Sequence, residues 1–159
     1  MKKLLLSLSL VATICLLSSC EGATGFGGIT GIWGLTHYEF VAYLDGEIFD
    51  SDSYDCNPDD PSNGDDEILV IKHVEGDTYV FQSYYWSNSQ KAWAYANSFS
   101  YEIKNGKFVD DEDDILTIKA SGGKLTITFE YNEVDDDYTY SENGKLVFKK
   151  MPAGTVPEN

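Results

Sequence analysis

Few side chains in this 159-residue chain are of the kinds that carry out catalysis or bind metal ions. The two histidines, His37 and His73, could form a zinc pair, but no Cys or further His at motif spacing completes a site. A Ser-His-Asp arrangement is compatible with the composition, yet no serine lies in a nucleophile motif. Cys56 lies far from both histidines in sequence and is best explained as a spectator thiol in a loop. We therefore predict a non-enzymatic protein with no catalytic residue, metal site or cofactor.

The N-terminus has the layout of a secretory signal. Lys2 and Lys3 precede an apolar run over residues 4–17, which is too short to span a bilayer. The sequence Leu17-Ser18-Ser19-Cys20 that follows resembles the lipobox of bacterial lipoproteins. In that family the cysteine is lipidated, with acyl chains such as palmitate, and becomes the first residue of the mature chain. The alternative is an ordinary secretory signal in which Cys20 is incidental.

The lipobox resemblance implies that the protein is located at a membrane. Each buried methylene of an acyl chain contributes about 0.8 kcal/mol, so several chains on Cys20 would hold the protein on a membrane without a transmembrane helix. Glu21 is unlike the Asp that marks retention in the inner membrane, so we expect the outer membrane of a Gram-negative cell. Only this one acidic residue follows Cys20 directly, which favours the periplasmic face over the cell surface. The oligomeric state is not indicated.

The charge of the chain excludes nucleic acid as a partner. Removal of residues 1–19 leaves 140 residues, the size of one domain, and changes the formal charge from −16 to −18 because Lys2 and Lys3 are lost. All 11 basic residues are lysines, so the guanidinium fork that binds phosphate is missing. With Cys15 removed and Cys20 lipidated, Cys56 has no partner for an intrachain disulfide.

The rest of the chain is dominated by strand signals. Residues 20–30 contain several glycines and form a tether, residues 31–151 form the domain, and residues 152–159 are a tail. All 22 aromatic residues lie in the mature chain, and no stretch shows sustained helical periodicity. We expect a long acidic loop over residues 45–66 and strands over residues 31–44, 67–74, 78–86, 93–103, 107–109, 115–120, 125–132 and 146–151.

These strands are joined by short turns, of which Asn105-Gly106, Gly122-Gly123 and Asn143-Gly144 carry hairpin signals. The first strand alternates imperfectly, so we expect a bulge or bend that reconciles the two faces. About eight strands in sequence fit an all-β, antiparallel, up-and-down barrel, which leaves no exposed sheet edge. An open sandwich is the alternative, but it would need longer connections than the second half of the chain offers.

The domain resembles the lipocalin-like lipoproteins of Gram-negative bacteria. The matching features are Gly31-Ile32-Trp33 at the start of the first strand, the run of hairpins, and a last strand that ends in Phe148-Lys149-Lys150. The resemblance implies that Trp33 packs at the closed end of the barrel under a basic side chain, for which Lys149 or Lys150 would have to serve. It also implies a small apolar or amphipathic ligand. The chain departs from the family in having neither a disulfide nor a helix after the barrel.

The aromatic strand faces suggest where such a ligand would bind. Candidate lining residues are Tyr79, Phe81, Tyr85, Trp93, Tyr95, Phe99 and Tyr101. They could instead fill the barrel, because eight strands enclose just enough space for side chains or for one small ligand. A further alternative is an exposed platform of Tyr84, Tyr85, Trp86 and Trp93 that recognises glycans or an envelope protein.

The acidic loops are candidates for calcium binding. The best cluster comprises Asp59, Asp60, Asn63, Asp65, Asp66 and Glu67, and residues 110–114 and 135–137 form similar acidic runs. None of them follows the ligand spacing of an EF-hand loop. We therefore expect solvated loops.

Overall fold

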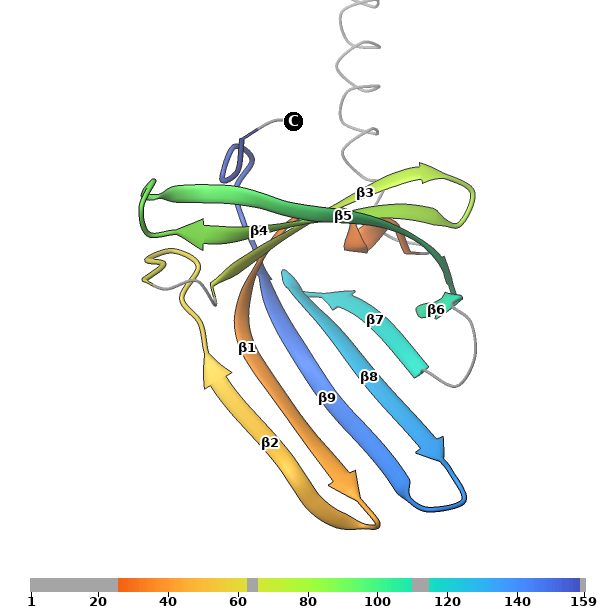
Figure 1. The fold of residues 1–159 in the computed structure, drawn as a ribbon. Helices are drawn as coiled ribbons and strands as arrows, with labels where there is room; N and C mark the ends of the chain where they lie inside the picture. The colour runs from red at the N-terminus through yellow and green to blue at the C-terminus, as the bar shows by residue number, and fades with distance from the viewer. Residues whose placement is uncertain (1–25, 63–65, 110–114, 158–159) are drawn as a thin grey trace, which may run out of the picture.

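The computed structural model describes residues 26–62, 66–109 and 115–157 (Figure 1). Within these ranges the chain forms one short 3-10 helix, η1 (Phe26–Ile29), and a single antiparallel sheet. No helix there is long and apolar enough to cross a membrane. The strands of the sheet are β1 (Gly31–Leu44), β2 (Glu47–Asp55), β3 (Glu67–Glu75), β4 (Thr78–Ser87), β5 (Ala92–Lys104), β6 (Lys107–Val109), β7 (Ile115–Ser121), β8 (Lys124–Val134) and β9 (Thr139–Lys150).

The sheet closes into an eight-stranded barrel. Strands β3 to β9 follow one another as neighbours, and β1 pairs with β3 on one side and with β9 on the other. The predicted up-and-down antiparallel barrel is therefore confirmed as a lipocalin-like barrel, and the open sandwich is excluded. Closure joins the first strand of the domain to the last, as the pairs Trp33–Lys150 and Leu44–Tyr140 show.

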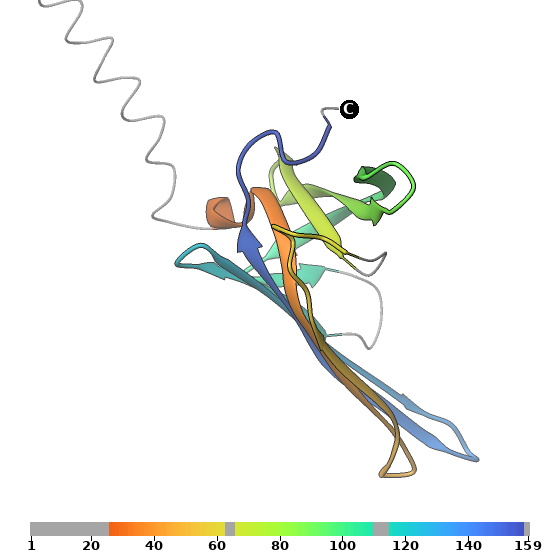
Figure 2. The same cartoon turned by 90° about the vertical axis from the view of Figure 1, so that its left-hand side faces the viewer.

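Strands β2 and β3 lie end to end along the same edge of β1. β3 pairs with Gly31–Gly34, and β2 pairs with residues 37–44 further along. Beyond the point where β3 leaves β1, the strands β2, β1, β9 and β8 continue as a flat sheet, which Figure 2 shows edge-on. We call this sheet the extension; it comprises residues 37–55 and 128–146. The molecule therefore has a rolled half and a flat half.

Strand β2 lies where we expected a loop. The prediction of a loop over residues 45–66 is wrong for Glu47–Asp55, because pairing with β1 overrides the low strand propensity of an Asp- and Ser-rich segment. The two-residue turn Asp45-Gly46, with φ values of 53° and 81°, is the signal that could have revealed the hairpin. Of the predicted loop, residues 56–62 and residue 66 are described and lie outside the strands.

Asn143-Gly144 is not a turn but lies inside β9. The turn that precedes β9 is formed by Asp135 and Tyr138, whose backbone N and O atoms are 2.9 Å apart. A Cβ atom at Gly144 would lie 2.3 Å from Cζ of Phe129, its neighbour on β8. Glycine is required there because an aromatic ring covers the backbone, and not because a turn needs positive φ.

Two other hairpin predictions and the predicted bulge are confirmed. Asn105 and Gly106 have φ values of 53° and 76°, and Gly122 and Gly123 have 59° and 76°, as two-residue turns require. The pairing of β1 with β9 shifts register between Leu35 and His37. The shift reconciles the two faces of this strand.

Candidate functional site

One end of the barrel is closed by Trp33, which is buried. Its Nε1 donates a hydrogen bond of 2.7 Å to the carbonyl of Ile29 in η1. The Nζ atom of Lys150 lies 4.3 Å from the ring centroid of Trp33 and donates to the carbonyl of Thr30 at 2.5 Å. Partial burial there lowers the pKa of Lys150. Of the two lysines considered from the sequence, the structure thus places Lys150 over the tryptophan.

The close approach of Lys150 depends on a glycine. Gly31 has φ of 127°, and a Cβ atom there would lie 2.1 Å from the Nζ atom of Lys150. Any larger residue at position 31 would push the lysine off the ring. Lys149 points elsewhere and forms an ion pair with Asp59 in the segment that follows β2.

A cavity of about 270 Å³ lies inside the barrel, where β1 has left β3. Its buried lining is apolar and comes from Leu69, Phe81, Ile127 and Phe148. Half-buried and exposed side chains form the rest of its wall: Glu67, Ser83, Asn97, Phe99, Tyr101, Phe108, Leu116 and Leu146. The cavity is thus an apolar chamber with a polar edge on β3, β4 and β5.

Aromatic rings in contact hold one wall of the cavity in shape. The ring centroids of Phe81 and Tyr101 are 5.4 Å apart and those of Tyr101 and Phe108 are 5.1 Å apart, both edge to face. Phe81 and Phe108 are 5.5 Å apart. Such contacts fix each ring against its neighbours. Phe99 is 52% exposed at the edge of the cavity, so an apolar surface faces solvent there.

Three polar side chains reach this apolar space. The hydroxyl of Ser83 donates to the Oδ1 atom of Asn97 on the neighbouring strand. The carboxyl group of Glu67 has no hydrogen-bond or ion-pair partner within the part of the chain that the structure describes. Burial raises the pKa of its carboxyl group, because desolvation disfavours the charged form.

The structure divides the predicted ligand-binding residues into two groups. Phe81, Phe99 and Tyr101 line the cavity, and Tyr79 is buried in the core cluster beside it. The others lie outside the cavity: Tyr85, Trp93 and Tyr95. Tyr85 is exposed at the far end of β4.

A β-bulge accounts for the positions of Trp93 and Tyr95. Ser83 pairs with Asn97, whereas the next residue of β4, Tyr84, pairs with Tyr95, so Ala96 is an extra residue in β5. One extra residue moves all side chains beyond it to the opposite face. Trp93 and Tyr95 therefore face outward, although strict alternation had placed them with Phe99.

Outside the barrel, Trp93 is buried rather than solvent-facing. It is 9% exposed and packs in a second cluster with Ile68, Val70, Tyr84, Met151 and Val156. Trp86 lies against it, with ring centroids 5.4 Å apart. The segment after β9 covers this cluster, so the predicted tail is part of the fold as far as it is described. Of the four aromatics of the alternative platform, only Tyr85 is exposed.

Several lining residues were missed from the sequence. Phe108, Leu116, Ile127 and Leu146 each lie on an apolar strand face, but alternation alone does not say which strands face one another across a barrel. Glu67 had been grouped with the calcium candidates because it follows an acidic run. Its neighbour Asp66 is buried and accepts a hydrogen bond of 2.8 Å from the backbone of Ser62.

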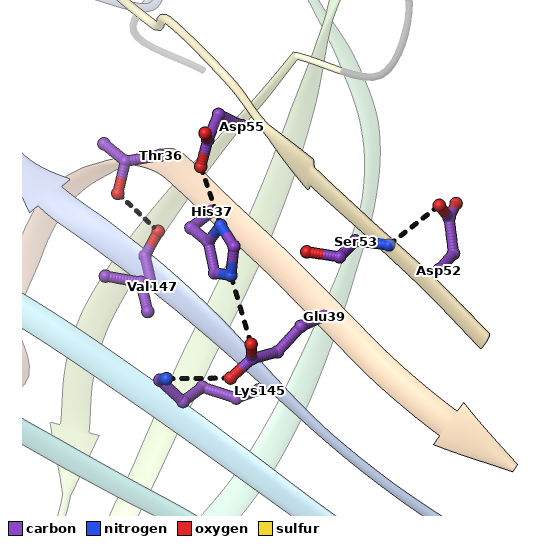
Figure 3. Close-up of polar contacts among 8 residues, drawn as sticks. All are labelled: Thr36, His37, Glu39, Asp52, Ser53, Asp55, Lys145 and Val147. Atoms are coloured by element: carbon purple, nitrogen blue, oxygen red, sulfur yellow. Dashed lines mark hydrogen bonds and ion pairs between the residues drawn. The ribbon is translucent and has the colours of Figure 1, made fainter.

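The extension carries a separate polar network, shown in Figure 3. Nδ1 of His37 lies 2.7 Å from the Asp55 carboxylate, and Nε2 lies 3.3 Å from the Glu39 carboxylate. Glu39 is also 2.8 Å from Nζ of Lys145. The hydrogen bond to Asp55 is the main cause that raises the pKa of His37, and the bond from Lys145 is the main cause that lowers the pKa of Glu39.

This network ties β2, β1 and β9 together at the start of the extension. Both ring nitrogens of His37 face carboxylates, which stabilise the positive charge of a protonated imidazole. Among the described residues, neither nitrogen faces a hydroxyl group, as a nucleophile-activating histidine would. His73 lies elsewhere, with Nε2 2.8 Å from the carbonyl of Gly76 in the turn after β3. Within the described ranges, no group of three or more His, Cys, Asp or Glu side chains could hold a metal ion.

Two larger hollows are poorer candidates for the site. One, of about 750 Å³, lies over the extension and is lined mostly by polar side chains such as Ser51, Ser53 and Asn143. The other, of about 470 Å³, lies between β1, β3 and β4 and the segment after β9. Its lining includes Gln82, whose buried Oε1 atom has no partner among the described residues.

Some sequence predictions lie outside the described residues. These are the lipidation site Cys20, the signal peptide before it, Asn63, Asp65 and the acidic run 110–114. No known protein family matches the chain. A search of curated proteins likewise finds no significant relative.

Proposed function

We propose that the protein binds one small apolar or amphipathic molecule in the barrel cavity and acts by binding rather than by catalysis. The observation that carries the proposal is the 270 Å³ space bounded by Leu69, Phe81, Ile127 and Phe148. Because the space opens to solvent beside Phe99, its apolar lining stays in contact with water unless a ligand covers it, and covering apolar surface contributes about 25 cal/mol per Å². An aromatic-rich chain that only needed a filled barrel would have closed this space.

The size of the cavity limits the ligand. At about 30 Å³ per molecule of liquid water, the cavity corresponds to roughly nine waters. A ligand of about ten non-hydrogen atoms therefore fits, and the cavity volume lies just below the range of about 300–1,000 Å³ that is usual for binding pockets. Aliphatic chains and single rings fall within this limit, whereas a whole phospholipid would leave most of its surface outside.

The proposed location of the protein is the outer membrane, where acyl chains on Cys20 would hold it on the periplasmic face. The lipobox resemblance supports this proposal, and the position at which the chain enters the barrel agrees with it. Because η1 and Trp33 lie at the closed end, the tether reaches the barrel away from the cavity. A Cys20→Ser variant that stayed in the membrane fraction would argue against the anchor.

The cavity can be tested with a small neutral fluorescent probe such as naphthol, which has about ten non-hydrogen atoms, after co-purified lipid has been stripped. We expect saturable binding of about one probe per chain. Ser83→Trp places an indole at the edge of the cavity and should weaken binding at least about tenfold. Ser98→Trp is the matched control, since this exposed residue lies one position along β5 from Asn97 and does not line the cavity. Absence of saturable binding, or equal effects of both variants, would refute the proposal.

A further inference from the structure

Glu67 is the feature of the cavity that a space for purely apolar ligands does not need. It lies at the start of β3, one residue before the pair Ile68–Gly34 that joins β3 to β1. Its side chain lines the same cavity as Leu69 and Phe81. For a purely apolar ligand, an aliphatic residue at position 67 would serve as well as Glu67. Such a replacement would break none of the described side-chain hydrogen bonds or ion pairs.

The carboxyl group of Glu67 has no partner among the residues that the structure describes. The described lining contains no Lys or His, and none of the described ion pairs or side-chain hydrogen bonds involves this carboxyl group. A partly desolvated carboxylate without a partner destabilises the folded chain, which is why such groups are normally paired. Its desolvation is also visible in the raised pKa of the group.

Two other polar side chains at the edge of the cavity bond to each other. The Oδ1 atom of Asn97 accepts the hydroxyl hydrogen of Ser83, and a neutral amide oxygen is a weaker acceptor than a carboxylate. Glu67 is therefore the strongest acceptor still free to meet a molecule in the cavity, and it has the sign of charge that attracts a cation.

We propose that the cavity selects amphipathic molecules that carry an amine or another cationic hydrogen-bond donor, with the Glu67 carboxylate as the acceptor. This inference rests on the proposed function, that the cavity binds a small molecule at all. The apolar part of the ligand would lie against Phe81 and Phe108, and its charged end would face Glu67. Fatty acids would bind poorly, because their carboxylate would meet that of Glu67.

Two further observations agree with this selectivity. The rings of Phe81, Tyr101 and Phe108 line the same space, and aromatic faces attract cations. The formal charge of the whole chain, −16, concentrates small cations near the protein and repels anions. Both effects act in the same direction as the Glu67 carboxylate.

Octylamine, octanol and octanoate test the inference, because they share a chain that fits the cavity and differ in charge. Octylamine is protonated at neutral pH, as lysine is. By calorimetry with the intact protein we expect octylamine to bind about 10- to 100-fold more tightly than octanol, the range of a charge-assisted hydrogen bond. Octanoate should be the weakest of the three.

Glu67→Gln should remove the preference for octylamine and leave the affinity for octanol within about twofold. Glu75→Gln, on the same strand but exposed and outside the cavity, changes the net charge equally and should keep the preference. If Glu67→Gln does not fold, Glu67→Asp can be used instead because it retains the charge. The order of affinities of the three ligands for the wild type also tests the inference without any variant. Octanol binding as tightly as octylamine would overturn the inference but not the proposed function, whereas failure of all three to bind would overturn both.

Discussion

The two halves of β1 pair with the same strand on one edge and with different strands on the other edge. Both halves pair with β9, but the first half pairs with β3 and the second with β2. In the first half Trp33 and Leu35 are each 2% exposed. In the second half most side chains are half-buried, and β2 is exposed along its length except at Tyr54.

The difference follows from what the neighbouring strand offers. β3 carries Ile68-Leu69-Val70-Ile71, which is apolar on both faces, so it is covered on the inside by the barrel core and on the outside by the second cluster. β2 carries Asp and Ser residues that are best left in water, and the sheet stays flat there. Apolar sequence thus decides which half of the shared strand is rolled into the barrel.

The extension is held by contacts of another kind. Tyr38 and Tyr54 pack across β1 and β2 as tilted rings with centroids 5.1 Å apart, and the ring of Phe129 covers Gly144. Such cross-strand pairs contribute about 0.2–1 kcal/mol each, far less than a fully buried side chain. Within single strands, the hydroxyl groups of Tyr131 and Tyr140 donate to carboxylates two residues further on at 3.0 and 2.8 Å.

The largest contrast between the halves should appear when a phenylalanine is truncated in each. Phe148→Ala opens a hole beside Leu35 in the barrel core and should cost about 3–5 kcal/mol of unfolding free energy. Phe49→Ala on β2, where the ring is 67% exposed, should change it by no more than about 0.5 kcal/mol. Urea denaturation measures both, and similar losses would mean that the extension is packed as tightly as the barrel.

A smaller effect is expected at Gly144, where the extension is most closely packed. Gly144→Ala would force the Phe129 ring and the backbone of β1 to move, at a cost of about 1–3 kcal/mol. The neighbouring Asn143→Ala changes an exposed side chain and serves as the control. A neutral Gly144→Ala variant would show that the flat sheet adjusts freely and that the ring does not require glycine.

Substitution of the two lysines at the closed end should lower the stability of the protein by different amounts. Lys150→Met removes the cation from the Trp33 ring and the hydrogen bond to Thr30, and should cost about 1–2 kcal/mol. Lys149→Met breaks only the exposed ion pair with Asp59 and should cost less than about 1 kcal/mol. Thermal unfolding of the two variants gives the comparison, and the reverse order would contradict the assignment of Lys150 as the capping residue.

The smallest effect is the pH dependence of the extension. Contacts with Asp55 and Glu39 raise the pKa of His37, so the protonated ring is favoured more in the folded chain than in the unfolded chain. Its contribution is complete below the unfolded pKa of about 6.5 and is lost as the pH rises through the folded pKa. The urea midpoint of the wild type, relative to His37→Gln, should therefore fall above about pH 6.5. A difference that does not change with pH would show that protonation of His37 does not contribute to stability.

Local signals in the sequence were sufficient for most of the barrel. Alternation located the strands around the cavity, and pairs such as Asn105-Gly106 located the turns because positive φ is nearly confined to such residues. Closure could be expected from the number of strands and the short connections between them. The contact of Trp33 with Lys150 could be anticipated only through the family resemblance, since it joins residues at opposite ends of the domain.

The features that were not predicted all depend on pairing across strands. The extra residue Ala96 reverses the faces of Trp93 and Tyr95, and nothing local marks that position as a bulge. Gly144 has the appearance of a turn residue until Phe129 is placed above it. Glu67 follows an acidic run, and only the folded barrel separates it from that run and turns it towards the cavity.

The pairing of β1 with β9 also sets the order in which the barrel can form. The hydrogen bond from Lys150 to Thr30 joins residues 120 positions apart, and β9 is the last strand in the chain. While the protein is being synthesised, β1 can pair with β2 and β3 but has no partner on its other edge. The barrel therefore closes only after residue 150 has left the ribosome, so β1 stays unpaired on that edge until the whole domain has been synthesised.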